Sequence, residues 1–213
     1  MVIILAISKT ITYFSNSWMG QALSLISIIV TLFVTSYQAI KAIRSRKNYS
    51  WAKVKKEIKC LKAYVLDINP DIIVSLSGRG GIVANLLSNE VNNEFPVYTC
   101  ILKGKLQQNF FQPDGWMKVS TSKWQIFIPP DILQMNNKRI LIVDDITNSG
   151  ETILVIKNTL VANKLNGDDI FSMALVADKE TQKNKHIPDY YWKMVDIDKY
   201  NVPWGKTIIN NYK

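Results

Sequence analysis

The sequence is poor in the residues that build most metal and nucleophilic sites. It has two cysteines, Cys60 and Cys100, and one histidine, His186. The cysteines lie far apart with no histidine between them, so a zinc site of the usual spacing is excluded and both are expected to be reduced thiols. Because His186 sits between Lys185 and Ile187, it is expected in a loop, and we expect no Ser-His-Asp triad or histidine-based metal site.

Charge is absent from a long N-terminal stretch. No charged residue lies between Lys9 and Lys41, and residues 18–37 form an apolar run of about the 20 residues that a helix needs to cross a bilayer. Hydroxyl side chains in the run can bond back to helix carbonyls. We favour a single membrane-spanning helix. The alternatives are an oligomerisation helix and a signal peptide, which the weakly charged start and the lack of a clear cleavage site disfavour.

Basic residues are concentrated directly after this run. Nine lysines and arginines and one acid, Glu57, lie in residues 41–62, which accounts for +8 of the formal net charge of +9. Beside a membrane span, such a cluster is expected on the cytoplasmic side. The alternative is a basic helix that binds nucleic acid, but the segment also carries an apolar stripe at helical spacing that commits one face to packing, so no nucleic-acid partner is expected. The stripe consists of Trp51, Val54, Ile58, Leu61 and Val65.

Residues 139–154 carry the most information about function. Residues 140–143 are continuously apolar, which is typical of a strand covered on both faces in a parallel sheet. Asp144 and Asp145 follow at its carboxyl end, where open α/β sheets place ligands. The next residues offer small polar side chains, a glycine and free amide donors at a helix start, which suits a phosphate. They are Thr147, Asn148, Ser149, Gly150 and Thr152.

The two acids require a different partner from the loop. Because carboxylates repel phosphate, Asp144 and Asp145 are expected to accept hydrogen bonds from sugar hydroxyls or to help hold a divalent cation. Together with the loop they indicate a site for a phosphorylated sugar. The alternative is an ordinary strand-to-helix turn with a capping aspartate.

Residues 143–152, VDDITNSGET, closely resemble the phosphoribosyl pyrophosphate (PRPP) binding motif of type I phosphoribosyltransferases. The resemblance implies an α/β fold with a Rossmann-like parallel sheet, flanking helices and a small C-terminal hood. It also implies that Asp144 and Asp145 contact the ribose hydroxyls and that residues 147–152 cradle the 5′-phosphate. The implied cofactor is Mg²⁺, held through PRPP; no direct protein ligand is assigned, and Asp144 and Asp145 are the candidates.

A second motif lies upstream in residues 70–90. Residues 72–74 predict a buried strand and residues 82–87 a helix. Glycines between them would let the backbone approach an anion, and an arginine adds charge and several donors. A flexible turn with a solvated arginine is an alternative, but the position one βα unit ahead of the acidic motif resembles the pyrophosphate-binding loop of the purine branch of the family. The loop residues are Ser77, Gly78, Arg79, Gly80 and Gly81.

A third segment, residues 188–206, resembles the tail of the 6-oxopurine phosphoribosyltransferases, which act on xanthine, guanine and hypoxanthine. The resemblance implies that Tyr200 stacks on the base. It also implies that Lys179, at the end of a predicted strand, donates to the carbonyl on the six-membered ring, although a lysine there is as often only solvated. Neighbouring aromatic residues are expected to pack in the interior instead. They are Tyr190, Tyr191 and Trp192.

The family reaction is displacement at the anomeric carbon of PRPP by a ring nitrogen of the base, with pyrophosphate leaving. The family also closes a mobile loop over the site, which here would lie in residues 103–130 and include a strand at 124–128. A homodimer is expected. The chain divides into a transmembrane segment, a basic juxtamembrane linker, a phosphoribosyltransferase domain and a short tail, with ranges 1–40, 41–49, 50–206 and 207–213.

Asn148 departs from the family pattern. The 6-oxopurine enzymes usually carry an aspartate there that hydrogen-bonds the purine and can accept its proton, which asparagine cannot do near neutral pH. We predict a single-pass, membrane-anchored purine phosphoribosyltransferase whose catalytic domain faces the cytoplasm, with Asp144, Asp145 and Asn148 at the catalytic centre. The alternative is a weak or inactive relative that senses PRPP or a nucleotide.

Overall fold

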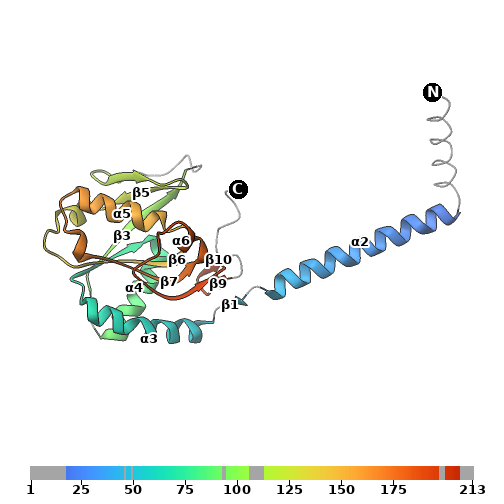
Figure 1. Ribbon diagram of the computed structural model, residues 1–213, viewed down its shortest axis with the longest axis horizontal. Coiled ribbons are helices and arrows are strands. Elements are labelled where there is room, and N and C mark those ends of the chain that lie inside the picture. Colours follow the sequence, from blue (N-terminus) through green and yellow to red (C-terminus); the bar gives the residue numbers. More distant parts are fainter. Residues whose placement is uncertain are drawn as a thin grey trace, which may run out of the picture. The chain divides into compact units, whose positions relative to one another are not determined.

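The computed structural model describes residues 18–45, 47–48, 50–92, 95–105, 113–196 and 200–206. The chain forms two compact units, residues 1–47 and residues 48–213. The first contains the helix α2 (Trp18–Ser45), and the second is an α/β domain (Figure 1).

Helix α2 is long and apolar enough to cross a membrane, and none of its apolar window, residues 21–38, is buried in the protein. Its hydroxyl groups bond back to the helix, as the sequence predicts. Thr31 Oγ1 donates to the Ser27 carbonyl at 2.8 Å, and Thr35 Oγ1 donates to the Thr31 carbonyl at 2.9 Å. These polar side chains are therefore compatible with an apolar environment.

A seven-stranded sheet organises the second unit, in the order β4-β5-β3-β2-β6-β7-β8. The expected α/β fold is confirmed, but the sheet is mixed rather than all parallel. Strands β3, β2, β6, β7 and β8 run parallel, whereas β5 is antiparallel to both β3 and β4. The β4–β5 connection is a tight turn, which only an antiparallel pair can use. The strands are β2 (Ile72–Leu76), β3 (Val97–Gly104), β4 (Met117–Ser120), β5 (Trp124–Ile128), β6 (Ile140–Thr147), β7 (Ile170–Asp178) and β8 (Tyr190–Val195).

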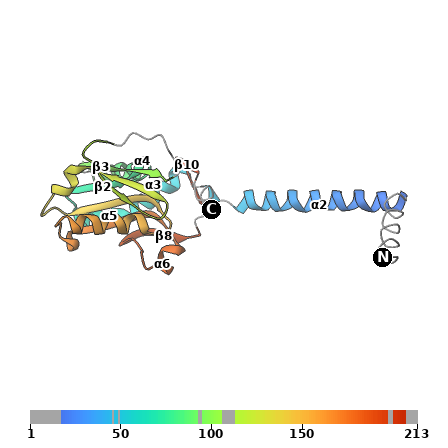
Figure 2. The same cartoon turned by 90° about the horizontal axis from the view of Figure 1, so that it is seen from above.

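Helices cover both faces of this sheet (Figure 2). Helices α3 (Trp51–Ile68) and α4 (Ser77–Val91) enclose one core with the sheet, and α5 (Glu151–Ala162) encloses the other. The predicted stripe of α3 is buried except at Trp51, which is 48% exposed at the start of the helix. The shorter helices are η1 (Pro130–Gln134), η2 (Gly167–Asp169) and α6 (Lys179–Lys183).

Strand register creates a crevice between β2 and β6. Pairing of these strands ends at Ser75 with Val143, whereas β6 continues beside β7 as far as Thr147 with Ala177. The chain also turns in opposite directions here, because β2 leads to β3 and β6 leads to β7 on the other side. Open α/β sheets bind ligands at such a switch point.

The C-terminal segment contributes a small second sheet. Strands β1 (Lys47–Asn48), β9 (Tyr200–Val202) and β10 (Gly205–Lys206) lie in the order β1-β9-β10, and β9 and β10 form an antiparallel hairpin with Gly205 opposite Val202. Trp204 lies in the hairpin turn and packs against the core cluster on the α3/α4 face. This hairpin corresponds to the predicted hood.

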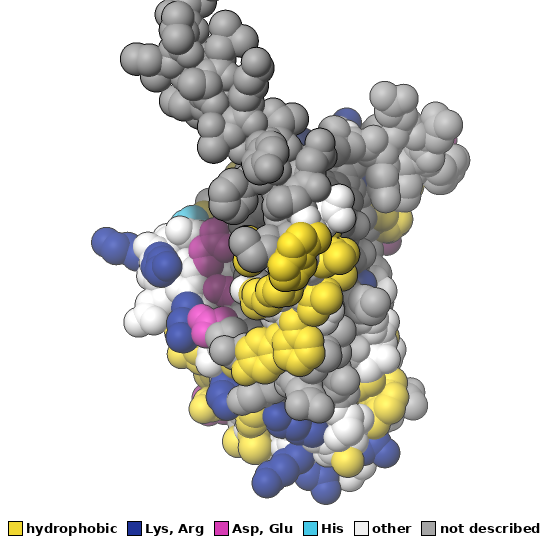
Figure 3. All heavy atoms as spheres, turned by 90° about the vertical axis from the view of Figure 1, so that its right-hand side faces the viewer, with side chains coloured by type: hydrophobic (Ala, Val, Ile, Leu, Met, Phe, Trp, Pro, Cys, Tyr) yellow, Lys and Arg dark blue, Asp and Glu magenta, His cyan; other side chains and the backbone are white. Residues whose placement is uncertain are grey.

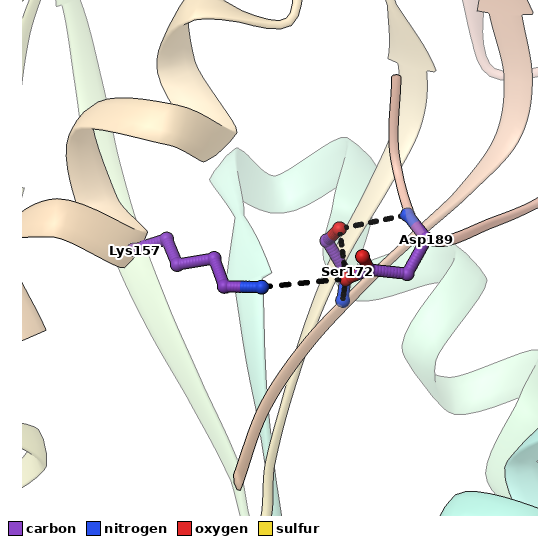
Figure 4. A network of polar contacts seen from close by, with 3 residues as sticks. All are labelled: Lys157, Ser172 and Asp189. Carbon is purple, nitrogen blue, oxygen red and sulfur yellow. Dashed lines mark hydrogen bonds and ion pairs between the residues drawn. The ribbon is translucent and has the colours of Figure 1, made fainter. Parts of the chain in front are cut away.

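A polar network aligns the last parallel strands (Figure 4). The backbone amide and hydroxyl of Ser172 in β7 donate to Asp189 Oδ2 at 2.8 and 2.7 Å, and the Asp189 amide donates to Ser172 Oγ at 3.0 Å. Lys157 of α5 lies 3.7 Å from the same carboxylate oxygen. Asp189 therefore has a structural role.

The aromatic side chains of Tyr190 and Trp192 in β8 pack against the core cluster on the α3/α4 face, so their expected packing is confirmed.

Candidate functional site

A pocket of about 360 Å³ lies at the carboxyl ends of β2 and β6. Its size is within the range of small-molecule sites. It joins the acidic motif, part of the upstream motif and the antiparallel edge of the sheet. The lining consists of residues 144–153 with Ser77, Arg79, Leu102, Gly104, Lys123 and Trp124.

Both acids are oriented by hydrogen bonds. Asp144 Oδ1 accepts from the Asp145 amide at 2.9 Å, and Asp145 Oδ1 accepts from the Ile146 amide at 2.9 Å. The other oxygen of Asp145 accepts from Trp204 Nε1 at 2.8 Å. Asp145 is only 5% exposed, so its carboxylate is held by donors on both oxygens.

Burial raises the pKa of Asp144 well above its ordinary value, and the adjacent Asp145 carboxylate raises it further. The Asp145 amide and the Arg79 guanidinium act in the opposite direction. A buried carboxylate beside another one gains from a nearby cation or donor. The described residues contain no cluster of three or more His, Cys, Asp or Glu side chains that could hold a metal. Two adjacent carboxylates are oxygen ligands of the kind that Mg²⁺ takes, and its remaining ligands would have to come from phosphates and water.

The loop after the acids is shaped for an anion. Thr147 Oγ1 is buried and has no hydrogen-bond partner, and Thr147 lines the pocket. A buried hydroxyl without a partner is costly, and a ligand oxygen would remove that cost. Gly150, which precedes α5, has φ +78°, and a Cβ there would clash with the His186 carbonyl oxygen. Only glycine fits this turn. The other predicted loop residues, Asn148, Ser149 and Thr152, also line the pocket.

The upstream motif is a helix start rather than an open loop. Ser77 begins α4 with φ +61°, a strained conformation for a residue with a side chain. A Cβ on Gly80 would lie 2.6 Å from the Val143 carbonyl oxygen, so Gly80 permits close packing of α4 on β6. Ser77 and Arg79 line the pocket, whereas Gly78, Gly80 and Gly81 are not among its lining residues.

Lys179, one of the two predicted base-binding residues, is not among the residues that line this pocket. Lys179 begins α6, and its ammonium lies 3.2 Å from Asp196 Oδ1 with 58% of the side chain exposed. The Tyr200 side chain lies outside the described residues, as do residues 106–112 within the predicted lid. Base binding by Lys179 and Tyr200 stays a prediction.

Sequence reasoning missed two contacts at the pocket. Glu151 accepts from the Ser122 amide at 2.6 Å and from the Ser122 hydroxyl, which ties the β4–β5 turn to the start of α5. Trp204 donates to Asp145. Neither contact has a local signal in the sequence, because each joins segments that only the fold brings together.

The described Lys and Arg side chains do not form one continuous basic patch on the face seen in Figure 3. There the described Lys and Arg side chains lie in separate groups among apolar and acidic side chains. Arg79 and Lys123 instead supply positive charge at the pocket itself.

The sequence matches the family model of the phosphoribosyl transferase domain over residues 48–206. Several solved structures share the fold. A purine phosphoribosyltransferase from Pyrococcus horikoshii Ot3 is 20% identical with a TM-score of 0.57, and the alignment covers 76% of this chain and 96% of that one. The Helicobacter pylori xanthine-guanine-hypoxanthine phosphoribosyltransferase is 18% identical with a TM-score of 0.56, and the alignment covers 75% of this chain and 94% of that one. A hypothetical protein from Neisseria gonorrhoeae with bound ppGpp is 17% identical with a TM-score of 0.54, and the alignment covers 75% of this chain and 89% of that one.

No curated protein matches the chain. The structural neighbours are too distant in sequence to show more than a shared fold. The family model, in contrast, covers most of the chain and includes both the acidic motif and the upstream helix start. The chain therefore belongs to the phosphoribosyltransferase family and has its type I fold.

Proposed function

We propose that the chain is a membrane-anchored phosphoribosyltransferase that transfers the 5-phosphoribosyl group of PRPP to a 6-oxopurine base and releases pyrophosphate. The observation that carries the proposal is the pocket, in which Arg79, the two acids and the loop 147–152 face one space. These are the groups that a ribose with a phosphate at each end requires.

The pocket suggests how PRPP would lie. The loop with the unpartnered Thr147 hydroxyl suits the 5′-phosphate, because it offers free donors at the start of α5. The acids suit the ribose hydroxyls, and Arg79 suits the pyrophosphate. Mg²⁺ would supply further charge neutralisation of the leaving pyrophosphate. The protein's own contribution is to bind and orient the ribose so that a ring nitrogen can attack its anomeric carbon.

The base would bind beside Asn148, which lines the pocket. Its amide can donate to and accept from a purine ring but cannot take up a proton. Two of the structural neighbours are purine phosphoribosyltransferases by name, which supports a purine as the acceptor.

The proposal includes the anchor. Helix α2 can span a bilayer, and the basic residues that follow it favour a cytoplasmic domain. PRPP is a cytoplasmic metabolite, which agrees with this orientation, and the domain would work as a homodimer.

A second candidate is a PRPP or nucleotide sensor on the same fold. It is favoured by Asn148, which replaces the usual acid, and by the Neisseria gonorrhoeae neighbour, whose structure contains ppGpp. In this case ligand binding would persist without transfer.

The test uses the full chain in detergent micelles with PRPP and Mg²⁺, and measures pyrophosphate release with hypoxanthine, guanine, xanthine and adenine in turn. Calorimetry measures PRPP binding in parallel. Release with a purine supports the enzyme, and binding without release supports the sensor. If PRPP does not bind, the enzyme and the PRPP sensor are both wrong, and only a sensor of nucleotides is left.

A further inference from the structure

The hydrogen bond between Trp204 and Asp145 joins two distant parts of the chain. Trp204 lies in the β9–β10 turn, and Asp145 lies near the end of β6, 59 positions earlier. The bond is 2.8 Å long, and Asp145 is 5% exposed. The hood hairpin therefore reaches one of the two acids that would contact the ribose.

This bond completes the restraint on the Asp145 carboxylate. The Ile146 amide fixes Oδ1, but one donor leaves the carboxylate able to rotate about its side-chain torsion. The Trp204 indole fixes Oδ2, and two donors define the plane of the group. Each oxygen retains a lone pair for a ligand hydroxyl.

The indole is suited to this task in a pocket for a polyanion. Trp Nε1 only donates, and it is uncharged, so it orients the acid without forming an ion pair that would compete with a ligand's cation. The ring is itself held, because its centroid lies 5.5 Å from that of Trp51 at the start of α3. A donor on a rigid ring positions its acceptor better than a donor on a flexible side chain.

The same hairpin also lies against Arg79. A Cβ built on Gly205 would come within 3.2 Å of Arg79 Nη2, so the residue after Trp204 borders the guanidinium. The β9–β10 hairpin thus lies beside both Asp145 and Arg79.

We propose that Trp204 is a positioning residue for ribose binding, which acts by holding Asp145 in the orientation that accepts the ribose hydroxyl. This inference rests on the proposed function. A structural role alone would predict a loss of stability, whereas positioning predicts a loss of PRPP affinity that depends on Asp145.

The experiment is a double-mutant cycle on the full chain in detergent micelles, with the dissociation constant of PRPP in excess Mg²⁺ as the readout. Trp204→Phe keeps an aromatic ring and removes the donor. It is expected to weaken PRPP binding about tenfold, since hydrogen bonds to charged groups have this order of effect. In an Asp145→Ala background, which has no side-chain acceptor for the indole, the same change is expected to have a much smaller effect.

The matched control is Trp192→Phe, which makes the same substitution in a tryptophan that packs against the core and does not line the pocket. It is expected to leave PRPP affinity unchanged. If Trp204→Phe does not fold, benzothienylalanine at position 204 replaces the N–H with sulfur at nearly constant shape and tests the same donor.

Wild-type affinity in the donor-free variant would overturn the inference, as would an equal loss in the Asp145→Ala background. These outcomes leave the proposed function intact. If the wild-type chain does not bind PRPP, the proposed function is wrong and the inference falls with it.

Discussion

The chain has two strand-to-helix junctions, β2–α4 and β6–α5, that look alike in sequence and differ in structure. Each follows a buried strand and contains glycine and small polar residues. At β6–α5 a true loop precedes the helix, with a buried, unpartnered hydroxyl at Thr147. At β2–α4 the helix starts immediately after the strand, and Gly80 is in contact with the backbone of β6.

The difference shows that glycine-rich junctions have two distinct physical uses. Gly150 supplies a positive φ that shapes an anion loop, whereas Gly80 supplies the absence of a side chain where a helix meets a strand. The β6 junction should therefore control ligand binding, and the β2 junction should contribute mainly to stability and supply Arg79 to the pocket.

The largest expected effect is on ligand binding at the β6 junction. Replacing both Asp144 and Asp145 by Asn removes the charged acceptors for the ribose hydroxyls and the cation. We expect PRPP affinity to fall about 100-fold, on the basis of two charged hydrogen bonds, with the fold retained. Calorimetric titration of PRPP with Mg²⁺ measures this.

The matched control uses a second pair of consecutive aspartates, which lies in η2. Asp168 and Asp169, replaced together by Asn, lose the same charge outside the pocket. PRPP affinity should be unchanged. Equal affinity in the Asp144/Asp145 double variant and the wild type would contradict the site.

The second effect is on stability at the β2 junction. In Gly80→Ala, the new Cβ would meet a backbone oxygen at 2.6 Å, so α4 must move away from β6. We expect the free energy of unfolding to fall by about 2–3 kcal/mol. Denaturant unfolding followed by circular dichroism measures it.

Gly78→Ala is the control within the same turn. Its Cβ would have no atom within 4 Å, and an alanine is favoured over glycine in a helix. This variant should be at least as stable as the wild type. If both alanine variants lose the same stability, the packing role of Gly80 is wrong.

The stability of the fold should depend on pH through Asp144 at the β6 junction. Because the folded state raises the pKa of Asp144 above its ordinary value of 3.8, protonated Asp144 stabilises the apo fold at acid pH. This stabilisation is lost as the pH rises through the folded pKa. Asp144→Asn removes the charge, so it should melt several degrees above the wild type at pH 7 and close to it near pH 3. Melting curves that stay parallel over this range would show that Asp144 is not perturbed.

A second consequence of burial concerns the thiols. Burial raises the pKa of Cys100 to about 12, whereas Cys60 is exposed. Both cysteines are free in the structure.

The sequence predicted the parts of the site that lie within one segment. The strand at 140–143, the acids after it and the loop to Thr152 form a local unit whose order along the chain sets their order in space. The stripe of α3 was predicted for the same reason, since helical spacing determines which side chains share a face.

Contacts between distant segments could not be predicted. Ser122 meets Glu151, and Trp204 meets Asp145, only because the sheet order and the hood hairpin bring them together. The antiparallel edge of the sheet was not predicted for the same reason, because the pairing of β5 with β3 depends on tertiary structure. The use of Gly80 in packing was hidden, because a motif does not reveal what a glycine faces.

The smallest expected effect is a gain of activity at Asn148, within the β6 junction. Asn148→Asp restores an acceptor for the purine proton in a pocket that already holds the ribose site, so turnover with a 6-oxopurine should rise several-fold. Steady-state pyrophosphate release measures it, with Asn158→Asp as a control that adds the same charge on the exposed side of α5. Only a base bound beside residue 148 could use the new acid. Unchanged or lower turnover would therefore contradict this placement of the base.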